Sequence, residues 1–432
     1  MKYPITIIFL LLSISIISQR EIIYDLDSYK QVNFQRSELL LNPNGGLSGI
    51  DHVNVVDSNV DFHFKIGADA VHNKNINNQK EQFTISQSAT ANIAEGIELF
   101  LSRKTAKRSY HKNKYLKLGY DSEVSFDNRR SQPSNVKENF KNLEFVGDLG
   151  FGFGRIEYVN HAWSAVQILQ ALEDNDLLLR IPSHEEITLF ADLVGTVRTD
   201  RILDFRLRNI EILETTINYL IEEKLIDQLS TRAILIISDT YQYDQIIQRN
   251  SGSRLEFTFA PGTRYISRNP EGSSSPTKLI RVYATGRIDH QSFKNMDVKW
   301  MQTRSYGAIL QFSNNYRYYA NNQLDMLTTK TADAGLTYTY GYRYLRSLRT
   351  NYKLTLSSQI FMNANIHDGN IIWFSAARLS ATLLASFNHY FSPYTQISIY
   401  GSLRYLDEEF QAGKFQPKIS GSANFTISQA IF

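Results

Sequence analysis

Histidine and serine come close together at one point of this sequence, in a combination that supports nucleophilic chemistry. His389 lies between Ser386 and Ser392, and a histidine that accepts the proton of a serine hydroxyl makes that oxygen a nucleophile. His367 and Asp368 form a second pair of acid and base. We interpret both groups structurally, because His389 stands at the end of a predicted strand and His367 stands in a turn-like run of Asn, Asp and Gly. We therefore expect no enzymatic activity.

Metal and cofactor motifs are also incomplete. Asp61 and His63 share one face of a predicted strand, but two ligands on one strand do not close a metal site. The glycines of 147–152 alternate with Leu149 and Phe151, and no helix start follows that would hold a phosphate. We interpret these glycines as room for close packing and expect neither a metal nor a cofactor.

Apolar and polar residues alternate over long stretches of the chain. In 333–344, for example, Ala334 and Leu336 alternate with Asp333 and Gly335. Because strand side chains point alternately to opposite faces, such a segment has one apolar and one polar face, and about ten residues cross a membrane when tilted. The same period occurs in about twelve segments: 60–71, 80–92, 115–127, 140–156, 253–267, 277–290, 299–314, 332–345, 350–364, 372–389, 394–406 and 417–432.

The number of strands and their connections predict the fold class. Segments 346–349 and 390–393 are short, whereas 268–276, 318–330 and 407–416 are longer and polar. Two other segments, 92–115 and 290–298, are too long for the short turns expected there, so ten and fourteen strands stay open. We predict an all-β transmembrane antiparallel barrel of about 12 strands (10–14) with an α-helical insert.

The start of the chain predicts export. Lys2, the mostly apolar run 5–17 and the small residue Ser18 are typical of a secretory signal peptide, and the run is shorter than the ~18 residues of a membrane span. We expect cleavage near Ser18, with an uncleaved anchor helix as the alternative. The chain has no cysteine, which excludes disulfides, and its net charge of +3 does not suggest a nucleic acid partner. The mean hydropathy is only −0.31, although the chain has 25 Tyr and 25 Phe. A barrel explains both values, because only alternate residues contact lipid and aromatic residues form girdles at the two membrane interfaces.

From 160 to 250 the period changes from two to 3.6, which predicts helices. Ser183 and Glu186 have the Ser-x-x-Glu spacing of a capping box at a helix start. The expected apolar stripes are Trp163, Val166, Leu169 and Leu172; then Ile187, Phe190 and Val194; and, over 200–224, Ile210, Leu213, Ile217, Leu220 and Ile221. A shorter helix is expected over 230–237. Such helices bury their stripes against one another, so we expect 160–250 to fold on its own. It is acidic, with 8 Lys and Arg against 15 Asp and Glu.

These patterns divide the chain into five parts: signal peptide 1–18, N-terminal segment 19–58, first part of the barrel 59–159, helical insert 160–250 and second part of the barrel 251–432. The N-terminal segment combines the apolar run 39–41 with the turn signal 42–46. A tail, an extra strand and a plug inside the barrel stay open for it.

The signal peptide, the alternating segments and the aromatic last residue Phe432 together resemble the outer-membrane β-barrels of Gram-negative bacteria. The resemblance implies an outer-membrane location, contact with outer-membrane lipid and insertion by the barrel-assembly machinery, which reads Phe432 as an assembly signal. Short turns of such barrels face the periplasm, which places the insert 160–250 there. The run 152–157 followed by a helical insert also resembles a group of uncharacterised Bacteroidota outer-membrane proteins, and this resemblance implies no function.

Charged side chains on the polar faces are the candidate functional residues. If the apolar faces meet lipid, the early strands place acids in the lumen and the later strands place bases there. In a closed barrel the two sets would face each other and create a field that acts on ions. The alternative is that they pair and fill the lumen. The residues are Asp61, Asp69, Asp121, Glu123, Glu144, Asp148, Glu256, Arg281, Arg287, Arg343, Lys353, Arg378 and Arg404.

Two functions follow from this arrangement, and a third is kept as a lesser hypothesis. The first is a channel or transporter for small polar solutes, with the lumen charges setting selectivity. The second is a structural or interaction protein whose acidic insert 160–250 binds a periplasmic protein or the cell wall, with the barrel as its anchor. The third is an outer-membrane hydrolase. Conductance in a bilayer distinguishes the first from the second.

Overall fold

The computed structural model describes residues 21–31, 33–48, 63–93, 97–131, 136–199, 205–228, 230–243, 248–270, 277–319, 327–347, 349–367, 370–392, 395–408 and 417–429. The predicted signal peptide 1–18, Asp61 and Phe432 lie outside these residues. The chain forms two compact units, one comprising Met1–Lys30 with Tyr158–Arg249 and the other Gln31–Glu157 with Asn250–Phe432.

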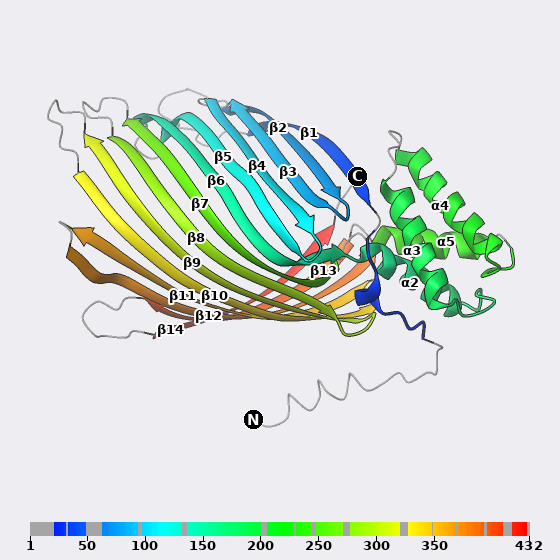
Figure 1. The fold of residues 1–432 in the computed structure, drawn as a ribbon. Helices are drawn as coiled ribbons and strands as arrows, with labels where there is room; N and C mark the ends of the chain where they lie inside the picture. The colour runs from blue at the N-terminus through cyan, green and yellow to red at the C-terminus, as the bar shows by residue number, and fades with distance from the viewer. Residues whose placement is uncertain are drawn as a thin grey trace, which may run out of the picture. The chain divides into compact units, whose positions relative to one another are not determined.

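A single antiparallel sheet dominates the second unit, and its strands lie in chain order (Figure 1). The predicted antiparallel β-fold is thereby confirmed. Among the described residues β1 pairs only with β2 and β14 only with β13, so the sheet is not closed. Its 14 strands are β1 (Phe34–Ser48), β2 (His63–Asn77), β3 (Glu81–Ile93), β4 (Ile97–His111), β5 (Lys114–Ser131), β6 (Val136–Tyr158), β7 (Asn250–Pro270), β8 (Thr277–Asn295), β9 (Trp300–Tyr319), β10 (Leu327–Ser347), β11 (Thr350–His367), β12 (Asn370–Ser392), β13 (Thr395–Glu408) and β14 (Pro417–Gln429).

Strand β4 has no counterpart among the predicted segments, and β1 lies in the 19–58 segment, for which an extra strand was one of three alternatives. In β4 the alternation holds only from Ile97 to Leu101, because Arg103 and Lys107 then make the apolar face polar as well. In β1 the run 42–46 has the composition of a turn, yet Pro43 pairs with Ala68 of β2. A proline is tolerated there because a strand at the end of a sheet has one side without ladder hydrogen bonds.

Connections differ in length between the two ends of the sheet. At one end only 78–80, 112–113, 296–299, 348–349 and 393–394 separate successive strands, and the chain leaves β6 and enters β7 at this same end. At the other end the connections 94–96, 132–135 and 368–369 are as short, but 49–62, 271–276, 320–326 and 409–416 are longer. The segment 92–115, which is too long for a turn, contains β4. The segment 290–298 is also too long for a turn because its first part, up to Asn295, belongs to β8. Both irregularities in the predicted turn lengths are thus explained.

The described residues of the first unit contain four α-helices, α2 (Asn160–Glu173), α3 (His184–Thr199), α4 (Phe205–Glu222) and α5 (Thr231–Tyr243). The central helix is α2, in which Trp163, Leu169 and Leu172 are fully buried, and α3 adds Ile187 and Phe190 to the same core. These stripes agree with the sequence prediction. None of the helices in the described part of the chain combines the length and hydropathy that a membrane-spanning helix requires.

The predicted apolar stripe of α4 is partly wrong. Ile217 and Leu220 are buried, but Ile210 is 51% exposed and the buried face instead includes Ile212 and Thr216. The Thr216 hydroxyl donates to the Ile212 carbonyl oxygen at 2.7 Å and bonds the Tyr241 hydroxyl of α5 at 2.7 Å. A polar residue is stable in this position because its hydroxyl has both partners inside the helical unit.

Residues 21–30 belong to the helical unit, so the 19–58 segment divides between this unit and strand β1. Ile22, Tyr24, Leu26 and Tyr29 are at most 3% exposed. The Ile22 amide donates to Gln170 Oε1 of α2 at 2.8 Å, and the Tyr24 hydroxyl bonds Thr188 Oγ1 of α3 at 2.9 Å. The helical core is therefore completed by a segment that precedes the sheet in sequence, and 160–250 alone lacks part of it.

The start of α3 is a capping box, as the sequence predicts. Ser183 N donates to Glu186 Oε2 at 2.7 Å, and Glu186 N donates to Ser183 Oγ at 3.3 Å. Arg180 adds two hydrogen bonds to the same carboxylate, at 2.5 and 2.9 Å. These donors stabilise the charged form, Arg180 most and then the Ser183 amide, and lower the pKa of Glu186 to about 2.

We expect acid to destabilise the helical unit through Glu186. Because its pKa is depressed on folding, the stabilisation is complete above the ordinary carboxyl pKa and is lost as the pH falls from that value toward about 2. Helix unfolding followed by circular dichroism between pH 6 and pH 2 should show this loss, and Glu186→Gln should flatten the pH dependence. The exposed neighbour Glu185→Gln serves as the control, and equal profiles for the two variants would contradict the assignment.

Candidate functional site

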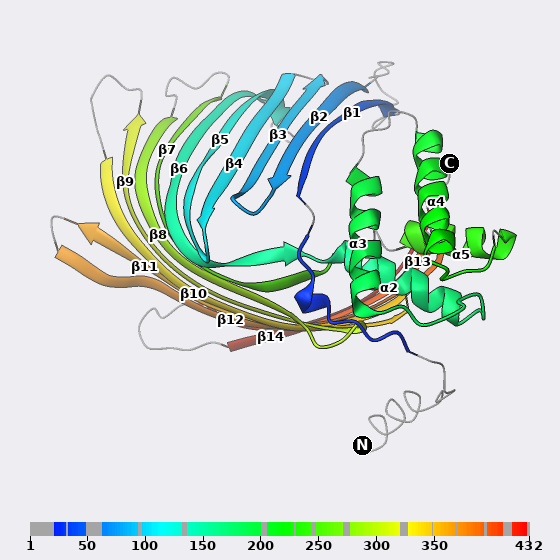
Figure 2. The same cartoon turned by 45° about the vertical axis from the view of Figure 1, so that its right-hand side comes forward.

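The sheet separates an apolar face from a charged one. We call the face that carries Leu336 the outer face and the face that carries Glu256 the inner face. Side chains of non-neighbouring strands meet on the inner face, such as Arg108 of β4 with Glu256 of β7, because the sheet curves toward this side (Figures 1 and 2). Leu336 is 57% exposed, whereas Glu256 is 6% exposed.

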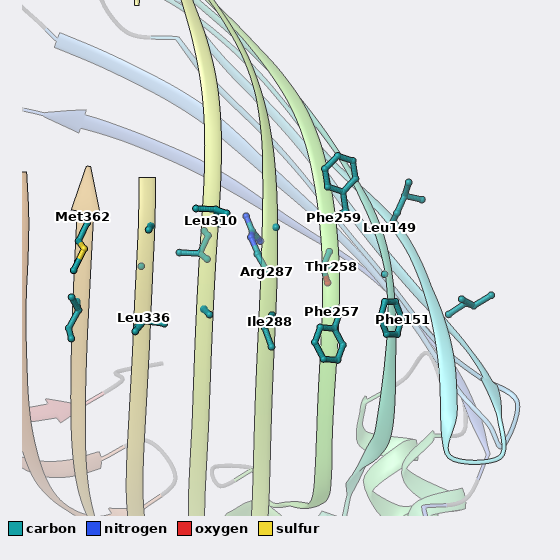
Figure 3. Close-up of a pocket in the computed structure, with 18 residues that line it drawn as sticks. Leu149, Phe151, Phe257, Thr258, Phe259, Arg287, Ile288, Leu310, Leu336 and Met362 are labelled. Carbon is teal, nitrogen blue, oxygen red and sulfur yellow. The ribbon is translucent and has the colours of Figure 1, made fainter. Parts of the chain in front are cut away.

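The outer face carries a band of exposed apolar side chains. Strand register aligns Phe257 with Ile288, Ile288 with Ala308 and Ala308 with Leu336, so the band is continuous from β7 to β10. A shallow groove of about 850 Å³ crosses this band from β5 to β11. Figure 3 shows the labelled apolar side chains around it, together with Thr258 and Arg287. Large exposed apolar surfaces of this kind mark contact with a partner or a membrane.

An ionic cluster around Glu256 occupies the inner face of β4 to β7. Glu256 accepts from Arg108 Nε at 2.8 Å and from the Tyr115 hydroxyl at 3.0 Å, and Lys117 Nζ lies 2.9 Å from its other oxygen. Lys117 also pairs with Asp148 at 3.3 Å. All of these side chains are at least largely buried, so each charge is compensated by a partner within hydrogen-bond reach.

Glycines of β6 make room for this cluster. A Cβ atom added to Gly152 would lie 2.4 Å from the ring of Tyr115, and one added to Gly150 would lie 2.6 Å from the Phe257 carbonyl oxygen. Only glycine allows the Tyr115 ring to approach the β6 backbone and place its hydroxyl on Glu256. This agrees with the sequence prediction that the glycines of 147–152 serve close packing.

A second cluster follows along the same face. The Tyr283 hydroxyl donates to Glu144 Oε1 at 2.6 Å, and Arg264 lies 3.8 Å from the same carboxylate. Glu144 is also the direct register partner of Glu123, whose carboxylate accepts from Asn142 Nδ2 at 2.9 Å. Two acids thus face each other across β5 and β6, and neighbouring donors offset their repulsion.

The later strands are richer in cations. Arg281 of β8 pairs with Asp333 of β10 at 3.7 Å, and Asn363 donates to the same carboxylate. Arg343 of β10 is the direct register partner of Lys353 of β11, which places two cations opposite each other on the inner face. Like charges in such positions repel each other.

Three of the predicted acids, Asp121, Asp148 and Glu256, pair with lysines of β4 and β5. Asp121 pairs with Lys104 at 3.6 Å, and Glu256 and Asp148 share Lys117. Among the cations that the sequence analysis missed, Lys104 and Arg108 stand on β4, where the loss of alternation concealed the strand, and Lys117 stands on β5. Asp69, Arg287, Arg378 and Arg404 are also on described strands, and Asp61 lies outside the described residues.

The histidine that suggested nucleophilic chemistry has other partners. His389 Nδ1 bonds the Thr350 hydroxyl at 2.9 Å, and its ring packs edge to face on Phe391 at 4.8 Å. These contacts hold it at the boundary of β11 and β12. Asp368, the partner of His367, lies outside the described residues. Within the described part of the chain no three His, Asp or Glu side chains gather in a geometry that would hold a metal ion.

Comparison with known proteins adds no assignment. The sequence matches no protein-family model, and a search of the curated proteins returns no significant match.

Proposed function

We propose that the protein is an outer-membrane β-barrel channel for small polar solutes. The observation that carries the proposal is the contrast between the two faces of the sheet, because the outer face exposes leucine and phenylalanine while the inner face carries ion pairs and charged rows. Strands of a membrane barrel require this arrangement, with apolar residues toward lipid and polar residues toward a water-filled lumen. In the proposed membrane form β1 and β14 close the sheet.

Orientation follows from the connections. The helical unit is inserted between β6 and β7 at the end of the sheet that has the short turns, and in barrels of this class that end faces the periplasm. We place the helical unit in the periplasm on this basis. Insertion by the barrel-assembly machinery, with Phe432 as its signal, belongs to the same proposal.

Charge on the inner face supplies the proposed selectivity. The clusters around Glu256 and Glu144 fill part of the face near β4 to β8 with paired groups, which narrows the path there. Arg343 and Lys353 place two positive charges opposite each other on β10 and β11. Rings and rows of such charge select ions of the opposite sign, so the channel should prefer anions.

Ion selectivity in a planar bilayer tests this function. The wild type should conduct, and replacing Arg343 and Arg378 by Glu should shift the reversal potential toward cations, because the change inverts charge on the inner face. The shift should shrink at high salt, since about 1 M salt reduces the screening length to ~3 Å. Lys141→Glu on the outer face of β6 is the control and should leave the reversal potential unchanged. Absence of conductance where a known porin conducts would contradict the proposal.

A second candidate function is an anchored interaction protein. The helical unit exposes several large apolar side chains, including Leu189 on α3, Leu207 on α4 and Leu235 on α5. Exposed leucines on a water-facing helical unit are typical of a partner surface. A wild type that inserts into membranes, does not conduct and loses a copurifying periplasmic partner on Leu207→Ser would favour this candidate over the channel.

A further inference from the structure

The apolar band of the outer face is interrupted on the first strands of the sheet. On β5 and β6 the outer positions near the short-turn end are Leu116, Leu118 and Phe151. On β2 to β4 the outer face carries a polar row of direct register neighbours, His72, Gln87 and Arg103. This row continues to Ser122 of β5. A lipid-facing arginine is strongly unfavourable at the bilayer midplane and much less so near the interface. An arginine on this face therefore needs a compensating partner.

This polar row borders a groove of about 370 Å³ that crosses β1 to β5. The next row of outer residues, away from the short-turn end, is Ala70, Ala89, Leu101 and Val124, again in direct register. The alanines lower the floor of the groove between the larger side chains of Leu39 and Leu101. The groove thus has a polar end and an apolar end, which matches a molecule with a charged head and a hydrocarbon chain.

Hydrogen bonds fix the polar end of the groove. His72 Nδ1 lies 2.9 Å from Gln87 Oε1, and because that oxygen only accepts, the histidine donates through Nδ1. His72 Nε2 then accepts from the Ser37 hydroxyl at 3.0 Å. The Gln87 carbonyl oxygen is occupied by this bond, so its amide N–H groups are the part that can donate to a ligand.

Arg103 is the cation of the polar row. Its guanidinium lies 5.4 Å from the centre of the Tyr120 ring and makes no ion pair with a described carboxylate. The nearest acids are engaged elsewhere, because Glu81 pairs with Lys107 at 3.1 Å and Asp121 pairs with Lys104 on the inner face. An arginine that makes no ion pair with a carboxylate can bind a phosphate through two parallel N–H donors.

We propose that this groove binds an anionic phospholipid of the leaflet at the short-turn end of the sheet. The phosphate bonds Arg103 and the Gln87 amide, and one acyl chain lies over Ala70, Ala89 and Leu101. An anionic headgroup is favoured over a zwitterionic one because the row offers no carboxylate for a headgroup amine. The inference rests on the proposed membrane-spanning fold and adds a lipid site on its outer face.

Lipid retention by the full chain tests the proposal. The purified protein in neutral detergent is titrated with dioctanoyl phosphatidylglycerol or dioctanoyl phosphatidylcholine, and bound lipid is counted by native mass spectrometry. We expect saturable retention of phosphatidylglycerol over phosphatidylcholine. Arg103→Leu should weaken it by about tenfold or more, because the phosphate loses its charged partner. Lys141→Leu, an outer-face lysine that lies over Phe126 outside the groove, should retain wild-type affinity.

Ala89→Leu provides an independent variant, because it fills the apolar end without changing charge and should also reduce retention of phosphatidylglycerol. Equal retention of the two lipids, or undiminished retention by both Arg103→Leu and Ala89→Leu, would overturn the proposal. A dimer that both variants abolish without any lipid dependence would assign the groove to a second copy of the chain and overturn it as well. The heat-modifiable folded form is checked in each sample, and its absence in the wild type would count against the membrane fold rather than the lipid site.

Discussion

Replacing Glu256 by glutamine is expected to destabilise the sheet strongly. The carboxylate compensates Arg108 and Lys117, and its removal leaves two largely buried cations without their shared anion. Breaking a buried ion pair by removing one partner costs about 3–5 kcal/mol. The midpoint of urea unfolding, followed by the heat-modifiable mobility of the full chain, should therefore fall clearly below that of the wild type.

Asp121→Asn is the matched control for this prediction. Asp121 also pairs with a lysine of β4, but Lys104 is 70% exposed and Asp121 is 45% exposed. Exposed pairs contribute about 0–1 kcal/mol, so this variant should unfold close to the wild-type midpoint. Equal midpoints for Glu256→Gln and Asp121→Asn would mean that the Glu256 cluster does not stabilise the sheet.

Introducing a charge at Leu26 is expected to unfold the helical unit. Leu26 is 1% exposed within the unit, and an aspartate there would bury an unpaired carboxylate. The cost of several kcal/mol is comparable to the whole stability of a domain of this size. Limited proteolysis of the full chain should then cleave 160–250 rapidly, at a temperature at which the wild-type helical unit resists.

Ile23 supplies the control for Leu26. It is a neighbouring apolar residue of the same segment but is 87% exposed, so Ile23→Asp should leave the proteolysis rate unchanged. A peptide of residues 19–31 should also bind an isolated 158–250 fragment and raise its helix content. Resistance of Leu26→Asp to proteolysis, or full helix content of 158–250 without the peptide, would show that residues 21–30 are not part of the core.

Periodicity predicts most of the sheet because one apolar face is imposed on strand after strand. Leu336 and Ile360, for instance, are register partners on the outer face, and both lie in predicted segments. Strand β4 escaped prediction because its second half is polar on both faces, so hydropathy carries no signal there. Strand β1 was only one of three alternatives for 19–58, because the run 42–46 after the apolar residues 39–41 has the composition of a turn.

The candidate site is less accessible to sequence reasoning. Alternation assigns Glu256 and Asp148 to the polar face, but their partners depend on curvature, which brings β4 within reach of β7. The packing of Ile22 and Tyr24 against α2 and α3 was hidden for a similar reason, since a contact between residues so far apart in sequence leaves no local pattern. The apolar residues Ile22, Tyr24 and Leu26, at a spacing of two, were a sequence signal for this segment.

Accessibility of neighbouring residues on β10 tests the membrane-spanning fold most directly. The chain contains no cysteine, so single cysteines can be introduced at the inner-face positions Thr337 and Thr339 and the outer-face positions Leu336 and Tyr338. After reconstitution into liposomes, a water-soluble maleimide should label the inner-face cysteines and spare the outer-face ones, which lipid covers. Equal labelling of the two sets would contradict a strand that crosses the bilayer with one face toward water.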